Sequence, residues 1–256
     1  MPRMSGPAPS PLPPPVILVH GFASSYEHNW VRTGWADTLG SRGHQVIGMD
    51  LPGHGGNSGP GGAAAAAVQL TELAGAHAAV DLVGFSAGAR ICALVAASGQ
   101  VPVRRVVLAG LGDSLLHGDS QHGGGQRGDS LPDGERPSGG DGDDPAGRPP
   151  MSLTGPLDPA DVRGGLFRRM AASAGNDPGR LERYLAAPAG DLTPGVLAQV
   201  GCPALVIIGE RDHLGPATAV MAALPSGTLL TLPRTDHFGT ASNVEAILAA
   251  ARFLAA

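Results

Sequence analysis

A serine stands between two glycines in the stretch Gly84-Phe85-Ser86-Ala87-Gly88, directly after an apolar run and before a run of small residues. Between a strand and a helix, this G-x-S-x-G pattern predicts a sharp turn that exposes the serine hydroxyl. Side chains at Gly84 and Gly88 would collide with the neighbouring strand and helix. The start of the helix also brings free N–H groups, which favour negative charge, to the hydroxyl. Ser86 is therefore a candidate nucleophile, and the alternative is a Gly-rich turn with an incidental serine.

A serine hydroxyl is a weak nucleophile unless a base accepts its proton, and histidine is the usual base. Four of the nine histidines stand where strands are expected to end: His20, His54, His213 and His237. His237 follows the last apolar run, in "TDHFGT", and Asp212 follows the fifth, in "IGERDHLGP". A carboxylate can accept the second proton of an imidazole and stabilise the imidazolium ion. We therefore predict that Ser86, Asp212 and His237 form one site.

Other residues compete for these roles. Asp113 follows the fourth apolar run and is an alternative acid. Asp236 adjoins His237, and neighbouring residues on an extended segment point to opposite sides, so a solvated role is expected for Asp236. The same argument applies to His213 beside Asp212. His20 and His54 are expected to stabilise their loops.

The residues that surround these candidates alternate between two patterns. Six apolar, strand-length runs cover residues 15–22, 44–52, 79–86, 103–111, 202–210 and 227–234. Segments of helix length lie between them, at about 30–41, 63–77, 87–98 and 216–224, and from 242 onward. The runs are nearly continuous, as in strands that are covered on both faces. This alternation predicts a parallel sheet with helices on both faces, in which a ligand lies beyond the carboxyl ends of the strands.

The order of the motifs resembles the α/β-hydrolase fold family, in its serine hydrolase, esterase/lipase-like branch. The matching motifs are His20-Gly21, "DLPGHGGNS", Gly84-Phe85-Ser86-Ala87-Gly88, "GERD" and "DHF". The resemblance runs from residue 15 to the C-terminus except for an insertion. It implies an α/β fold with a mostly parallel sheet of six or more strands, helices on both faces and a small helical lid.

The resemblance also implies a role for each matching residue. Ser86 would be the nucleophile, His237 the general base and acid, and Asp212 the carboxylate that orients His237. Family members form the oxyanion hole from two backbone N–H groups, which map here to Phe22 and Ala87. No metal and no organic cofactor is implied. The serine nucleophile disfavours epoxide hydrolase and haloalkane dehalogenase activities, which use an aspartate.

The implied reaction is the cleavage of a carboxylic ester, thioester or lactone, with a small-molecule acyl substrate and an acyl-enzyme on Ser86. The same triad also serves C–C bond hydrolysis, perhydrolysis and non-hydrolytic acyl transfer or cyclisation in biosynthesis, and fold and triad alone do not separate these reactions. A non-catalytic binding protein on the same fold is the alternative from another class. Such proteins usually lose a triad member, and none is missing here.

Composition divides the chain into segments. Residues 1–15 form a Pro-rich lead, and residues 113–157 form a Gly/Pro/Asp-rich insertion with few apolar side chains. Ordering such segments costs conformational entropy with little burial, so we expect the lead to be disordered and the insertion to be flexible. The hydrolase core is expected at 16–112 and 201–256. Residues 158–200 can form two or three short helices, which we expect to be the lid.

Charge and cysteine content limit the possible partners and location. The formal net charge is −5 and the basic residues are scattered, which argues against a nucleic-acid partner. No apolar run approaches the roughly 18 residues that span a bilayer. The lead lacks the apolar segment of a secretory signal. Cys92 and Cys202, the two cysteines, lie in apolar segments, as core residues in a reducing compartment do. We therefore expect a soluble cytoplasmic protein.

Overall fold

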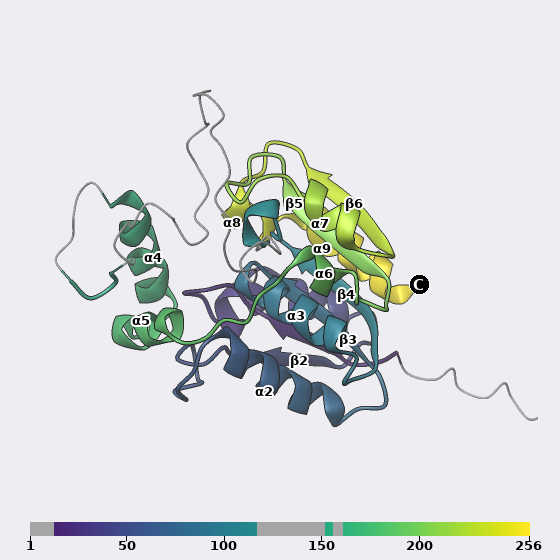
Figure 1. Ribbon diagram of the computed structural model, residues 1–256, viewed down its shortest axis with the longest axis horizontal. Helices are drawn as coiled ribbons and strands as arrows, with labels where there is room; N and C mark the ends of the chain where they lie inside the picture. The colour runs from purple at the N-terminus through teal and green to yellow at the C-terminus, as the bar shows by residue number, and fades with distance from the viewer. Residues whose placement is uncertain (1–12, 117–151, 156–160) are drawn as a thin grey trace, which may run out of the picture.

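The computed structural model describes residues 13–116, 152–155 and 161–256 (Figure 1). Residues 1–12 of the expected disordered lead lie outside these ranges. Most of the expected flexible insertion, residues 117–151 and 156–157, also lies outside the described residues. The described chain therefore covers the expected hydrolase core completely and most of the expected lid.

A single sheet of six parallel strands forms the centre of the molecule, in the order β2-β1-β3-β4-β5-β6. The strands are β1 (Val16–Val19), β2 (Val46–Met49), β3 (Val80–Phe85), β4 (Val103–Ala109), β5 (Ala204–Gly209) and β6 (Gly227–Leu232). Each strand lies within one of the six apolar runs. The predicted fold class, an α/β fold with a parallel sheet, is confirmed.

Burial distinguishes the inner strands from the edges of the sheet. Strands β1, β3 and β5 are buried along their whole length, as nearly continuous apolar runs predict. The edge strands β2 and β6 are only partly covered, and Leu229 of β6 is 44% exposed. The apolar runs therefore located all six strands but did not distinguish the edge strands from the central ones.

Helices cover both faces of the sheet (Figure 1). One face packs against α2 (Ala63–Gly75), α3 (Ala87–Ser98), α6 (Pro194–Leu197) and α7 (Thr218–Ala223). The other face packs against α1 (Trp35–Gly40) and α9 (Val244–Ala255). Alternate residues of β1 serve the two faces, since Ile17 and Val19 join the first core and Val16 and Leu18 the second. This two-sided core fixes the strand ends from which the candidate residues project.

The segment expected to be one helix at 30–41 is divided. It forms a single π-helical turn, η1 (Glu27–Val31), followed by α1. The two are separated by Gly34, whose φ of 86° is in the left-handed region that glycine tolerates best. Single π turns are frequent at functional sites, and η1 contributes Asn29 to the cavity described below.

Two helices, α4 (Val162–Ser173) and α5 (Pro178–Ala186), stand apart from the sheet and its covering helices (Figure 1). They lie beyond the end of the sheet at which the short helix α8 (His237–Thr240) is found. Asp161 and Asp177 cap α4 and α5, because each carboxylate accepts a hydrogen bond from a backbone N–H in the first turn. No helix among the described residues is long and apolar enough to cross a membrane.

Candidate active site

Ser86 occupies a strained turn between β3 and α3. Its φ of 53° and ψ of −114° are unusual for a residue with a side chain. A Cβ atom at Gly84 would collide with the backbone of Gly88, and one at Gly88 would collide with the carbonyl oxygen of Val19 in β1. Both glycines are therefore required by the close approach of α3 to the sheet. The turn holds the Ser86 side chain in a cavity.

His237, in the segment after β6, lies next to Ser86. Its Nε2 lies 3.0 Å from the Ser86 Oγ, which is hydrogen-bonding distance. His237 is the first residue of α8, and the carboxylate of Asp236 caps this helix by accepting the Gly239 N–H at 2.7 Å. Asp236, expected to be only solvated, is exposed and also holds the helix that positions His237.

Asp212 completes a chain of three side chains. Its Oδ1 and Oδ2 lie 3.0 and 2.9 Å from Nδ1 of His237, and the backbone N–H of Leu214 donates to Oδ1 at 2.9 Å. The Asp212 side chain is fully buried and that of His237 nearly so. Such a carboxylate holds the imidazole proton on Nδ1, which leaves Nε2 free to accept the serine proton.

Asp113, the alternative acid, is engaged elsewhere. It begins the short 3₁₀ turn η2 (Asp113–Leu115), and its Oδ1 accepts the backbone N–H groups of Ala219 and Val220 in α7 at 2.9 and 3.0 Å. The structure therefore brings Asp212, and not Asp113, to His237.

The loop after β1 presents one unbonded N–H group between two bonded ones. The N–H of Gly21 donates to Oδ1 of Asn29, and that of Ala23 donates to Nε2 of His54, both at 3.1 Å. Phe22 lies between them, and within the described chain its N–H has no hydrogen-bond acceptor. The N–H of Ala87, at the start of α3, is likewise without an acceptor in the part of the chain that the structure describes. Both residues line the cavity beside Ser86, so two donors are available to a developing oxyanion.

Two buried histidines brace this loop. Nε2 of His20 accepts the N–H of Leu51 at 3.1 Å, and its Nδ1 lies 2.8 Å from the Gly21 carbonyl oxygen. This arrangement puts the His20 proton on Nδ1. Since Nε2 is then an acceptor, its 3.4 Å approach to Asp50 is not a hydrogen bond. His54 has the same tautomer, because its Nδ1 lies 2.9 Å from the Pro52 carbonyl oxygen. Burial lowers the pKa of His54, and the nearby His20 lowers it further, to about 3.

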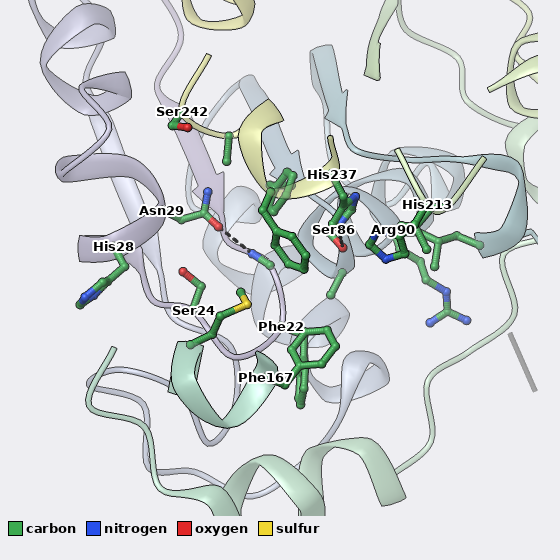
Figure 2. Close-up of a pocket in the computed structure, with 18 of the residues that line it drawn as sticks. Phe22, Ser24, His28, Asn29, Ser86, Arg90, Phe167, His213, His237 and Ser242 are labelled. Atoms are coloured by element: carbon green, nitrogen blue, oxygen red, sulfur yellow. Dashed lines mark hydrogen bonds between the residues drawn. The ribbon is translucent and has the colours of Figure 1, made fainter. Parts of the chain in front are cut away.

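Ser86 and His237 line a cavity of about 490 Å³. Figure 2 shows Ser86, His237, Phe22 and Phe167 among the side chains that line it. Most of the lining is apolar, and it includes Phe167 and Met170 of α4. A cavity of this size suits a small molecule with an apolar part.

His213 lies closer to the site than its sequence position indicated. Its ring centroid is 4.8 Å from that of His237, and the side chain lines the cavity. Side-chain atoms of Asp212, His213 and His237 lie within 4.8 Å of one another, which is close enough to hold a metal ion. A metal bound to Nδ1 of His237 would replace the proton that this nitrogen shares with Asp212, so the observed hydrogen bond suits proton transfer better than metal binding.

Asn29 and Ser114 also line the cavity, and sequence reasoning did not select them. Neither belongs to one of the motifs that match the family, so the sequence carries no signal for them. Their proximity to Ser86 depends on η1 and η2, two short turns whose presence the sequence did not predict.

Comparison with known families agrees with this geometry. A family model described as alpha/beta hydrolase fold matches residues 14–241. The chain therefore belongs to the α/β-hydrolase fold family, and the prediction of a hydrolytic enzyme of this family is confirmed. The comparison with curated proteins found no significant match.

Solved structures share the fold at low sequence identity. A carboxylesterase structure from Nitrososphaera gargenis is 16% identical with a TM-score of 0.64, and the match covers 95% of this chain and 90% of that one. The enol-lactonase from Burkholderia xenovorans LB400 has the same values. The 2-hydroxy-6-oxo-6-phenylhexa-2,4-dienoate hydrolase from Rhodococcus sp. strain RHA1 is 18% identical with a TM-score of 0.63, and the match covers 94% and 90% of the two chains. At such identities these similarities establish the fold alone.

Proposed function

We propose that the protein is a serine hydrolase that cleaves a carboxylic ester, thioester or lactone through an acyl-enzyme on Ser86. The observation that carries the proposal is the continuous hydrogen-bonded chain from Asp212 through His237 to Ser86, which ends in a cavity. Two backbone N–H groups beside Ser86 have no acceptor among the described residues. A nucleophile, a base, an orienting carboxylate and an oxyanion site are together the requirements for acyl transfer.

The reaction follows from this geometry. Nε2 of His237 accepts the Ser86 proton as Oγ attacks the carbonyl carbon, and the N–H groups of Phe22 and Ala87 stabilise the oxyanion. His237 then donates that proton to the leaving alcohol or thiol, and the acyl group remains on Ser86. Water, deprotonated by His237, attacks the acyl-enzyme. Collapse of the second oxyanion releases the carboxylic acid and returns the proton to Ser86. Asp212 remains ionised and stabilises the imidazolium in both steps.

We further propose that α4 and α5 act as a lid. Phe167 and Met170 of α4 and Leu185 of α5 line the same cavity as Ser86. Phe167 also contacts Phe22, whose N–H is one of the two proposed oxyanion donors, with ring centroids 5.3 Å apart. The apolar side chains of the lid would select the substrate and exclude water from the acyl-enzyme.

A fluorophosphonate probe tests the proposed nucleophile. We expect intact-mass analysis to find a single label and peptide mapping to place it on Ser86. The label should disappear in Ser86→Ala and in His237→Ala. Ser114→Ala is the matched control and should keep the label, because Ser114 lines the cavity but its hydroxyl has no histidine partner in the described chain. Labelling at another residue, or folded protein that takes no label and turns over no acyl ester, would refute the proposal.

We also infer a cytoplasmic location. Cys92 and Cys202 are buried and form no disulfide. Burial raises the pKa of both thiols, that of Cys202 to about 11, and keeps them protonated. Such thiols are typical of a reducing compartment. Recovery in the cytosolic fraction of the native cell would support this location, and recovery in a secreted fraction would contradict it.

A further inference from the structure

The side-chain amide of Asn29 is only half satisfied. Its Oδ1 accepts the Gly21 N–H at 3.1 Å, whereas its Nδ2 is fully buried and has no acceptor among the described residues. Asn29 itself is only 5% exposed. A buried amide N–H without an acceptor costs free energy, so a partner that supplies an oxygen at this point would be bound favourably.

Asn29 lines the same cavity as Ser86. Figure 2 shows the Asn29 oxygen on the Gly21 N–H and the nitrogen turned away from it, to the side on which Ser242 is drawn. Two neighbouring hydroxyls of the lining already donate their protons to the protein. The Thr33 hydroxyl donates to the backbone carbonyl oxygen of Asn29 at 2.7 Å, and the Ser242 hydroxyl donates to the backbone carbonyl oxygen of Gly239 at 3.3 Å. In contrast to these two hydroxyls, the Asn29 amide is a buried side-chain donor whose N–H group is not used by the described part of the protein.

The donor also lies close to the reacting centre. Asn29 holds Gly21, and the next residue, Phe22, supplies one of the two proposed oxyanion donors. Standard bond lengths and the 3.1 Å hydrogen bond place Nδ2 no more than about 9 Å from the Phe22 nitrogen. One small substrate can therefore reach both Nδ2 and the proposed oxyanion donors.

We propose that Nδ2 of Asn29 binds an acceptor oxygen of the substrate, such as a keto, ether or second ester oxygen, a few bonds from the scissile carbonyl. The proposal rests on the hydrolase function proposed above. It defines the substrate class more narrowly, as acyl compounds that carry a second oxygen function rather than simple hydrocarbon esters. Asn29 has two functions in this view, since Oδ1 positions the oxyanion loop and Nδ2 binds the substrate.

Matched substrate pairs test the proposal. Phenyl butyrate and phenyl methoxyacetate differ by an acceptor on the acyl side, and butyl butyrate and 2-methoxyethyl butyrate differ by one on the leaving-group side. Ether oxygens accept hydrogen bonds but cannot donate them. The rate ratio within each pair therefore depends on whether the protein offers an N–H donor. Asn29→Asp keeps an oxygen for the Gly21 N–H and removes the donor. General damage to the oxyanion hole affects both members of a pair and cancels in their ratio of kcat/KM.

We expect Asn29→Asp to lower the preference for the oxygenated member of at least one pair about tenfold. Asn243→Asp is the matched control, because Asn243 caps α9 outside the cavity and aspartate caps equally well. Its ratios should equal those of the wild type. Unchanged ratios for both pairs in folded Asn29→Asp would overturn the proposal, and would mean that water satisfies Nδ2.

A second measurement needs no variant. Hydroxide ion hydrolyses both members of each pair without a binding site, so its rate ratio measures intrinsic reactivity. We expect the wild-type ratio for one pair to exceed the hydroxide ratio about tenfold. Equal ratios for both pairs would overturn the assignment of Asn29 and leave the hydrolase function standing. No turnover of all four esters together with no label on Ser86 would instead refute the hydrolase function, and the Asn29 proposal would fall with it.

Discussion

The backbone N–H of Ala23 donates a hydrogen bond to Nε2 of His54 at 3.1 Å, so a histidine from the loop after β2 holds the loop after β1. This bond requires the neutral imidazole, since protonation of Nε2 would turn an acceptor into a donor. His54 also packs against Phe22 and Tyr184, with ring centroids 5.5 and 5.0 Å away. It therefore connects the proposed oxyanion site to the proposed lid.

The buried His54 makes stability depend on pH. Its pKa is lowered to about 3 in the folded protein, against about 6.5 in an unfolded chain. Between these values the unfolded state binds a proton that the folded state does not. The contribution of His54 to stability is therefore complete above about pH 6.5 and is lost as the pH falls toward 3, by up to about 1.4 kcal/mol per pH unit.

Urea unfolding of the wild type and His54→Gln at pH 7.5 and pH 5 measures this effect. Glutamine keeps an acceptor for Ala23 and does not titrate. We expect the stability difference between the two proteins to shift by about 2 kcal/mol in favour of the variant at pH 5. An equal change in the free energy of unfolding of the two proteins between pH 7.5 and pH 5 would contradict the prediction. If the variant does not fold, ¹⁵N shifts of His54 in the wild type should still show a proton held on Nδ1 down to about pH 4.

The two candidate acids should respond differently to the same substitution. Asp212→Ala removes the partner of His237, and we expect kcat/KM to fall about 10³–10⁴-fold with little change in fold. Asp113→Ala removes the acceptor for the first N–H groups of α7 and should cost about 1 kcal/mol of stability while kcat/KM changes less than about threefold. Ester kinetics and thermal unfolding of both variants test the assignment, which a reversed pattern would contradict.

The glycines on either side of Ser86 should not tolerate replacement by alanine. A Cβ at Gly88 would collide with the backbone carbonyls of Val19 and His20, which cannot move without shifting β1. We expect Gly88→Ala to lose more than about 3 kcal/mol of stability. Gly75→Ala is the control, since its added Cβ would meet only Val101 at 3.8 Å near the end of α2, and a gain of about 0.5 kcal/mol is expected. Equal stabilities for the two variants would show that α3 packs less closely against β1 at Gly88 than the structure indicates.

The proposed lid should affect substrates according to their size. Phe167 lies 5.3 Å from Phe22 and 6.4 Å from Phe238, measured between ring centroids, and it lines the cavity. We expect Phe167→Ala to raise the KM for 4-nitrophenyl octanoate about tenfold and that for the acetate less than about twofold, because only the longer chain reaches the ring. Phe253→Ala, on α9 at the far face of the sheet, should leave the ratio of the two KM values unchanged. Equal effects of Phe167→Ala on both esters would argue against a lid that selects by size.

Local sequence features were sufficient to predict much of this protein. Strand-length apolar runs predict buried strands because burial is the main driving force for folding. The requirement for glycine at Gly84 is local, because a Cβ there would collide with the backbone of Gly88. The order of the motifs along the chain was by itself sufficient to indicate the family. Asp212 and His237 could be selected because each lies in the segment that follows a strand, at the edge of a parallel sheet where ligands bind.

Other features were decided only by the tertiary structure. The partners of Asp113 and Asp236 are backbone N–H groups of short helices, and no local pattern distinguishes an acid that caps a helix from one that orients a histidine. Asn29 lies in a π turn that the sequence did not predict, and His213, which is exposed as expected, also contacts His237. The contacts of Asp113 and His213 join segments that are far apart in the sequence, so they depend on loop conformations that form only when the whole core is packed.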